Sequence, residues 1–203
     1  MKKSLTMLAV STIIISSSSA FAKDGAFVQA FGGVTHMAKA IGASGSPADS
    51  AAIYGAGVGY NFNKISTSIT IDTVTGENSH DRSQTFESTA ILLNGFYNFS
   101  NSTKFTPFLG AGIGSTLSKK SKIPDTAVDY ASSFVYEVQG GAKYAVSKHV
   151  SVLGSLSYRQ YLKTGGTYKV TGGTYSGDQG ALTEDERAGF EFFAAKVAVQ
   201  YDF

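Results

Sequence analysis

Apolar and polar residues alternate at every second position along most of this chain, and this pattern constrains the fold more than any other feature. In 132–146, one series begins with Phe134 and Tyr136, while Glu137 and Gln139 belong to the other. Successive side chains of a β-strand point to opposite faces, so such a segment presents one apolar and one polar face. Apolar residues at helical spacing are rare throughout. The alternation therefore predicts an all-β protein.

Eight segments carry this alternation. They are Ala26–Thr35, Ala52–Phe62, Ile65–Thr75, Thr89–Phe99, Phe105–Leu117, Ser132–Val146, Ser151–Leu162 and Phe190–Phe203. Strands of about ten residues are long enough to cross a bilayer at a tilt. The pattern is least clear in the first segment, where Phe27 and Phe31 compete with Val28 for the outward side. It is also blurred in the fourth segment, by Leu92 and Phe96.

The connections between these segments alternate in length. Short turns at Phe62–Lys64, Ser100–Lys104 and Ser147–His149 alternate with longer polar loops at His36–Ser50, Gly76–Gln84, Ser118–Tyr130 and Lys163–Ala188. Short turns on one side and long loops on the other are typical of outer-membrane barrels.

The alternative is a soluble β-sandwich or a lipocalin-like barrel, in which the apolar positions face the core and the polar positions face water. Here the polar positions are rich in Gly, Ser and Thr with few charges, as in a confined lumen, and Tyr and Phe gather near strand ends, as in an aromatic girdle. We therefore predict an all-β fold, an eight-stranded antiparallel transmembrane β-barrel. Its closure pairs every backbone hydrogen bond, as lipid requires.

The first 22 residues have the pattern of a secretory signal peptide. Lys2 and Lys3 precede the apolar run Leu5–Ile15, and the A-x-A stretch Ala20–Ala22 follows. The run is too short for a membrane-spanning helix. We expect cleavage after residue 22 and a barrel domain over residues 23–203. Without the two lysines the chain has 15 Lys and Arg against 15 Asp and Glu, so no nucleic-acid partner is expected.

The chain has few residues that could act in catalysis or bind a metal. There is no Cys, and the three His residues are scattered, so we expect no metal site and no cofactor. His149-Val150-Ser151 resembles the His-x-Ser pattern of outer-membrane lipid A deacylases. The predicted topology puts His149 in a periplasmic turn and Ser151 in the lumen, away from lipid A in the outer leaflet. We therefore do not expect an enzyme.

Longer motifs carry a family resemblance. Leu93–Phe99 reads LNGFYNF, Thr106–Gly114 reads TPFLGAGIG, and the chain ends in Tyr201-Asp202-Phe203. With these motifs the chain resembles the small Gram-negative outer-membrane β-barrels, the OmpA-like, OmpX and opacity-protein porin family. The resemblance implies a location in the cell outer membrane, with short turns in the periplasm and long loops outside the cell. It also implies that Tyr201 and Phe203 form the signal read by the outer-membrane assembly machinery.

Charged residues at inward positions should pair, because an eight-stranded barrel is only just wide enough to be filled by its own side chains. The sixth and seventh segments form a hairpin around position 148, and a symmetric turn places Glu137 directly opposite Arg159. We predict a lumen ion pair between them, with Asp72, Lys143 and Lys196 as further lumen charges. Two interpretations stay open: a structural plug, which the small bore favours, and a gated narrow channel.

The long loops are the expected working surface. Lys119, Lys120 and Lys122 are candidates to contact lipopolysaccharide phosphates, or they form a solvated charge cluster. The fourth loop repeats Thr-Gly-Gly-Thr-Tyr at 164–168 and 171–175, which predicts either a β-hairpin with edge strands for a partner or an irregular loop. We expect a structural or surface-interaction role, adhesin- or opacity-like, with loops that contact host surface ligands, phage or lipopolysaccharide. A narrow pore for small solutes is the alternative, and a lipid A-modifying enzyme is the third hypothesis.

Overall fold

The computed structural model describes residues 24–41, 51–77, 85–99, 102–123, 126–130, 132–164, 166–170, 177–181 and 188–203. The predicted signal peptide lies outside the described residues. These residues contain no helix with the length and hydropathy needed to cross a membrane.

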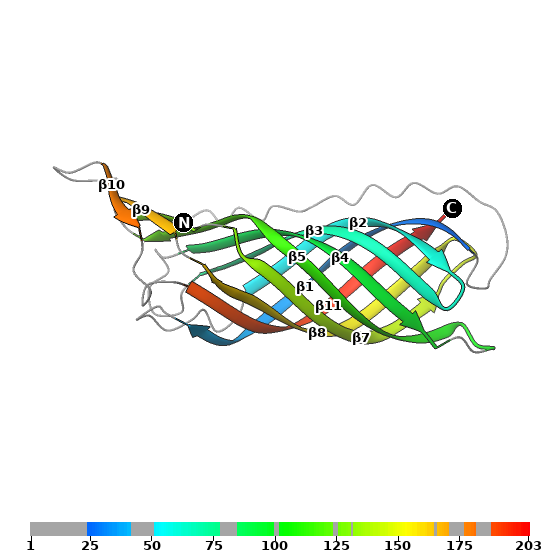
Figure 1. Cartoon of the computed structure of the whole chain (residues 1–203). Coiled ribbons are helices and arrows are strands. Elements are labelled where there is room, and N and C mark those ends of the chain that lie inside the picture. The colour runs from blue at the N-terminus through cyan, green and yellow to red at the C-terminus, as the bar shows by residue number, and fades with distance from the viewer. Residues whose placement is uncertain are drawn as a thin grey trace, which may run out of the picture.

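Eight long strands close into a barrel, and three short ones extend it at one end (Figure 1). The strands are β1 (Gly25–Ile41), β2 (Ala51–Phe62), β3 (Ile65–Glu77), β4 (Thr85–Asn98), β5 (Phe105–Ile123), β6 (Thr126–Tyr130), β7 (Phe134–Ala145), β8 (Val150–Thr164), β9 (Gly166–Val170), β10 (Gly177–Ala181) and β11 (Ala188–Asp202). The barrel order is β1–β2–β3–β4–β5–β7–β8–β11, every pair is antiparallel, and β11 pairs with β1. The prediction of an eight-stranded antiparallel barrel is confirmed.

The two faces of the wall follow the alternation, including the segments where it was ambiguous. Leu156 on β8 is 70% exposed on the outside, whereas Leu92 on β4 is fully buried in the lumen. On β1, Val28 faces out and Phe27 faces in. Inward glycines make room for such aromatic rings: a Cβ on Gly59 would lie 2.3 Å from Phe27 Cζ. The rings that blurred the pattern are therefore lumen filling.

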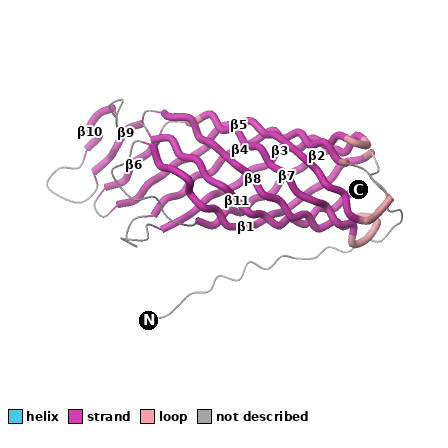
Figure 2. Tube along the Cα trace, turned by 90° about the horizontal axis from the view of Figure 1, so that it is seen from below, coloured by secondary structure: helices cyan, strands magenta, loops and turns pink. Residues whose placement is uncertain are grey.

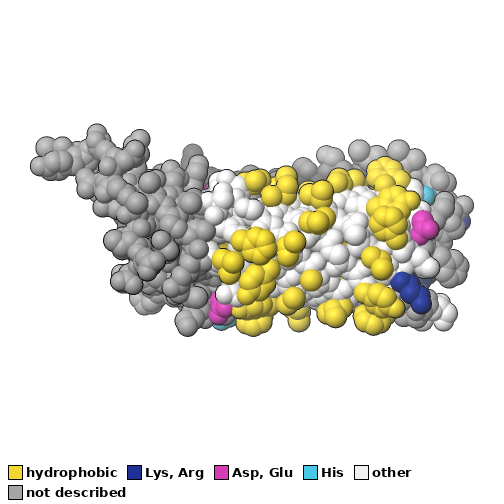
Figure 3. Space-filling view, viewed as in Figure 1, with side chains coloured by type: hydrophobic (Ala, Val, Ile, Leu, Met, Phe, Trp, Pro, Cys, Tyr) yellow, Lys and Arg dark blue, Asp and Glu magenta, His cyan; other side chains and the backbone are white. Residues whose placement is uncertain are grey.

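Aromatic side chains mark the two edges of the lipid-facing wall. On β7, Phe134 and Tyr144 both point outward and each is about half exposed. Ten residues of a strand tilted by about 40° span roughly 25 Å, the height of the apolar band of outer-membrane barrels. In Figure 3 the hydrophobic side chains gather toward both ends of the described wall, and the coloured charged groups lie beyond them. The short turns and the C-terminus share one end (Figure 1).

Beyond the aromatic edge that lies away from the short turns, the strands continue where loops were expected. β5 runs on to Ile123, and β6 pairs with it in the register of β7, since Ser115↔Phe134 and Lys120↔Asp129 belong to one ladder. The β6–β9 ladder likewise continues the register of β7 with β8. The prediction of a loop over Ser118–Tyr130 is therefore wrong. We call β6, β9, β10 and the end of β5 (residues 118–123) the extracellular extension, because the family resemblance implies that the end opposite the short turns lies outside the cell. Figure 2 shows it beyond one mouth of the barrel.

Register shifts at the same end explain why the alternation failed there. They lie between Met37 and Lys39 on β1, at Leu117 on β5 opposite Thr89 and Ala90, and on β8, where Leu162 and Lys163 together lie opposite Gly189 of β11. A β-bulge inserts one residue into the ladder and interrupts the period-two pattern, and bulges are common at barrel rims. In the fourth loop, β9 and β10 pair as an antiparallel hairpin, so the hairpin prediction is confirmed; residues 171–176 lie outside the described residues.

Candidate functional site

Four charged side chains from four strands meet inside the barrel, and we call them the charged layer. Asp72 comes from β3, Glu137 from β7, Arg159 from β8 and Lys196 from β11. All occupy inward positions of the alternation, and none is more than 8% exposed. Two anions and two cations make the layer electroneutral, the condition under which charges are tolerated away from water.

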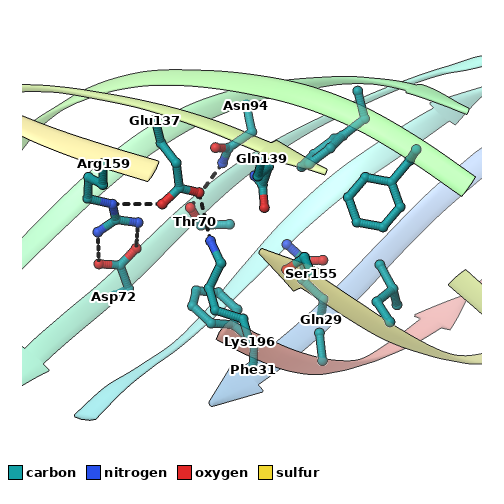
Figure 4. A pocket seen from close by; sticks show the side chains of 14 residues that line it. Gln29, Phe31, Thr70, Asp72, Asn94, Glu137, Gln139, Ser155, Arg159 and Lys196 are labelled. Carbon is teal, nitrogen blue, oxygen red and sulfur yellow. Dashed lines mark hydrogen bonds and ion pairs between the residues drawn. The ribbon is translucent and has the colours of Figure 1, made fainter. Parts of the chain in front are cut away.

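Arg159 is the centre of this layer (Figure 4). Its Nη1 and Nη2 donate to Oδ1 and Oδ2 of Asp72 at 2.6 and 2.7 Å, and its Nε donates to Glu137 Oε2 at 2.8 Å. The other oxygen of Glu137 accepts a bond from Lys196 Nζ at 2.7 Å. Bidentate, charge-assisted bonds of this kind are the strongest that side chains form with each other. Because β3 and β8 are not neighbours, the Asp72–Arg159 pair bridges the lumen.

An apolar layer covers the charged layer on the side of the extracellular extension. It consists of Ala51, Ile53, Val74, Ala90, Leu92, Val135, Tyr161, Phe192 and Ala194. The two layers are joined, because the Tyr161 hydroxyl accepts a bond from Arg159 Nη1 at 3.2 Å and the guanidinium carbon lies 5.6 Å from the centre of the Phe192 ring. The bore is therefore filled by side chains at two successive levels.

A small polar cavity borders the charged layer. Its volume is about 50 Å³, and Asp72, Glu137, Arg159 and Lys196 form part of its lining. Across it, Asn94 Nδ2 donates to Thr70 Oγ1 at 3.0 Å. A space of this size holds at most a few water molecules.

A polar belt crosses the lumen at the end with the short turns. Asn61 Nδ2 donates to Asp202 Oδ1 at 2.8 Å, Ser66 Oγ donates to Asn61 Oδ1 at 2.8 Å, and Asn98 Nδ2 donates to Ser66 Oγ at 2.7 Å. The belt joins β2, β3, β4 and β11, so the C-terminal strand is tied to the opposite wall as well as to its neighbours.

The structure brings together most, but not all, of the predicted lumen charges. Glu137 and Arg159 are directly opposed in the β7–β8 ladder, and Asp72 and Lys196 join them. Lys143 faces Leu153 further toward the short turns, and the ion pairs found among the described side chains do not include it. Tyr161 was missed, although it shares the inward parity of Arg159 two residues earlier.

The residues of the other sequence hypotheses lie elsewhere. Tyr201 and Phe203 stack edge-to-face at 5.2 Å on the outside, and the Phe203 amide donates to the Ala26 carbonyl. His149 lies in the β7–β8 turn with Nδ1 2.7 Å from the Asp202 carbonyl oxygen. Ser151 is 5% exposed in the lumen, so its hydroxyl has no access to lipid.

The three lysines of the third loop lie in the strand that replaces that loop. In the register of β4 with β5, Lys119 pairs with Ser88, Lys120 with Glu87 and Lys122 with Thr85. On the other side, Lys120 pairs with Asp129 of β6. Their side chains lie outside the described residues.

A family model described as the outer membrane protein beta-barrel domain matches residues 7–203. The chain belongs to this family. It is therefore an outer-membrane protein. The outer membrane protein PagN of Salmonella typhimurium is 35% identical over 78 residues, which cover 34% of this chain and 33% of PagN. The match thus spans about a third of that relative.

Solved structures with the same fold are more distant in sequence. Neisserial surface protein A has a TM-score of 0.60 at 18% identity, with 88% of this chain and 97% of that chain covered. OprG of Pseudomonas aeruginosa has a TM-score of 0.56 at 14% identity, with 89% and 97% covered. At these identities the likeness shows the barrel fold shared by outer-membrane proteins.

Proposed function

We propose that this protein is a surface-interaction barrel, in which the membrane part is a closed scaffold and the extracellular extension is the working surface. The observation that supports the proposal is the pair of filled layers in the lumen, since a buried Asp72–Arg159 bridge crosses the bore and an apolar layer covers it. Function on such rigid scaffolds concentrates in the exposed segments that they hold.

The extension supports this role because it is built from strands that continue the barrel ladders. β5, β6 and β9 keep the register of the wall below them, so they hold their outer ends in a fixed orientation. An ordered sheet loses less conformational entropy on binding than a flexible loop. We propose host surface ligands as its partners, in an adhesin- or opacity-like role.

A variant without the hairpins of the extracellular extension tests this proposal. Residues 119–129 and 166–181 are replaced by two-residue turns, and folding is checked by the heat-dependent gel migration of folded barrels. We expect unchanged migration, and loss of the adhesion that the intact protein confers on an otherwise non-adherent bacterial strain. Equal adhesion by the folded variant would refute the surface-interaction role.

We propose lipopolysaccharide phosphates as the contact of Lys119, Lys120 and Lys122. Of the three, Lys119 pairs in register with the buried, inward Ser88, and Lys120 pairs with two acidic residues, Glu87 and Asp129, so Lys122 should carry most of the attraction. Lys122→Ala should weaken binding to lipopolysaccharide more than Lys120→Ala does. An equal effect of Lys120→Ala would contradict this assignment.

The second candidate function is a narrow pore, and the polar cavity beside the charged layer is the observation that favours it. Planar-bilayer recording of the wild type and of Arg159→Ala distinguishes the two functions. A pore gated by the charged layer conducts, and its conductance rises in the variant. A closed scaffold conducts in neither form.

A further inference from the structure

Lysines mark the end of the barrel that carries the short turns. Among the cations whose side chains the structure describes, three are exposed, and each lies in a different short turn: Lys64 between β2 and β3, Lys104 between β4 and β5, and Lys148 between β7 and β8. The remaining ones lie in the lumen. Figure 3 shows a cationic side chain at this end, directly beside hydrophobic side chains of the wall.

The described carboxylates at this end leave two of these lysines without an ion pair. Asp24 Oδ1 accepts a bond at 2.6 Å from a backbone amide of the turn that carries Lys64. Asp202 belongs to the polar belt inside the lumen, and the C-terminal carboxylate follows β11, next to β1. The ion pairs found among the described side chains include neither Lys104 nor Lys148.

Lys104 and Lys148 lie in neighbouring turns. The Ala145 amide, at the end of β7, donates to the Lys104 carbonyl at 2.9 Å, and Lys148 follows Ala145 by three residues. On the membrane side of these turns, Phe105 of β5 pairs with Tyr144 of β7, and each is about half exposed on the outer wall. Two cations thus flank an outward aromatic pair.

The two lysines lie at the level of lipid head groups. Lys104 directly precedes Phe105, and Lys148 follows the outward Val146, which is 54% exposed, by two residues. One or two residues of extended chain reach about 3–7 Å beyond this apolar edge. The head-group layer is about 5–8 Å thick on each side of a bilayer. Both lysines therefore lie within this layer, where lipid phosphates are the acceptors that flexible ammonium groups can reach.

We propose that Lys104 and Lys148, together with the Phe105–Tyr144 pair, form a binding site for an anionic phospholipid of the inner leaflet. Short turns of outer-membrane barrels lie in the periplasm, which places this site in the leaflet made of phospholipids. The phosphate accepts charge-assisted hydrogen bonds from the two ammonium groups, and the acyl chains lie against the apolar wall. A soluble anion would gain only the first of these contacts. The site is at the opposite end from the extracellular extension and does not rest on the function proposed above.

The net charge of the lipid decides its affinity for this site. Phosphatidylglycerol carries one uncompensated negative charge, whereas the choline group of phosphatidylcholine offsets the charge of its phosphate. A lysine at an anionic lipid surface contributes about fivefold to binding, and salt screens this contribution. We therefore expect phosphatidylglycerol to be preferred, and the preference to fall as the salt concentration is raised.

Lys143 provides a matched control for the two turn lysines. It directly precedes Tyr144 on β7 but has the inward parity, and it faces Leu153 in the register with β8. Lys143→Gln therefore removes one positive charge from the same end of the barrel, on the lumen side. Lys104→Gln and Lys148→Gln remove the same charge from exposed turn positions, so all three variants should migrate as folded barrels in unheated gels.

The experiment measures retention of phosphatidylglycerol and of phosphatidylcholine by the folded, detergent-solubilised protein, using native mass spectrometry. We expect the wild type to retain phosphatidylglycerol at least fivefold better. Lys104→Gln and Lys148→Gln should each lower this retention about fivefold, and Lys143→Gln should lower it less than twofold. If one turn variant fails to fold, the other decides the test.

Four results would overturn the proposal. Equal retention of the two lipids would show that charge does not select the occupant, and an equal loss with Lys143→Gln would show that the turn lysines form no local site. Displacement of the lipid by an equal concentration of glycerol 3-phosphate would indicate a site for a free phosphate. Purified lipid A retained better than phosphatidylglycerol, and lost with Lys104→Gln, would assign these lysines to the glycolipid of the outer leaflet.

Discussion

We expect Arg159 to contribute more to the stability of the membrane barrel than any other lumen side chain. It donates four hydrogen bonds to Asp72, Glu137 and Tyr161, and it is 1% exposed. Arg159→Met keeps much of the side-chain volume but leaves Asp72 as a buried carboxylate without its bidentate partner. Breaking a buried ion pair from one side costs about 3–5 kcal/mol, so we expect a loss of this size in the free energy of unfolding.

A double-mutant cycle separates the ion pair from the loss of packing. In Asp72→Asn/Arg159→Met, the uncompensated carboxylate is gone and the Glu137–Lys196 pair is untouched. The double variant should therefore be at least about 2 kcal/mol more stable than the sum of the two single losses implies. Lys143→Met is the matched control, because it removes a half-buried lumen cation outside the charged layer, and it should cost about 1 kcal/mol or less.

The assay is urea unfolding of the protein in lipid vesicles, followed by circular dichroism and by the migration of unheated samples. The reasoning is refuted if Arg159→Met destabilises no more than Lys143→Met. It is also refuted if the Asp72–Arg159 coupling energy falls below about 0.5 kcal/mol, the level at which independent sites simply add.

Three further predictions concern the wall, the lumen and assembly. Val138 and Val199 are each 51% exposed on the outer wall. Cys introduced at either position should react in intact cells with membrane-dissolved maleimides and not with water-soluble ones. The reverse pattern would contradict the assignment of the two faces. Gly59→Leu should prevent or strongly destabilise folding, by about 2 kcal/mol or more, because its Cβ would overlap the Phe27 ring, whereas Gly154→Leu should fold normally as judged by gel migration. Deletion of Phe203, which is 67% exposed, should lower the amount of folded protein in the outer membrane several-fold while the purified variant still refolds in detergent; equal defects in both settings would assign Phe203 to stability rather than to assembly.

The alternation of the sequence was sufficient to predict the eight barrel strands and the lipid-facing side of all but the first, where Phe27 and Phe31 left the outward side open. The reason is that a strand repeats every two residues, so a single parity decides the environment of the whole segment. The opposition of Glu137 and Arg159 was also predictable, because a short turn sets the register of its own hairpin. These are local relations, contained within one strand or one hairpin.

Only the tertiary structure decided which groups meet across the lumen. Asp72 reaches Arg159 from a strand that is not its neighbour, and Lys143, with the same inward parity as Glu137, takes no part. The stagger and tilt of the closed barrel set the height of each side chain, and neither quantity can be read from the sequence of a single strand.

The extracellular extension was not predicted from the sequence, for a related reason. Beyond the membrane neither face of a strand must be apolar, and bulges at Leu117 and at Leu162 and Lys163 interrupt the period, so pairing there depends on the ladders below.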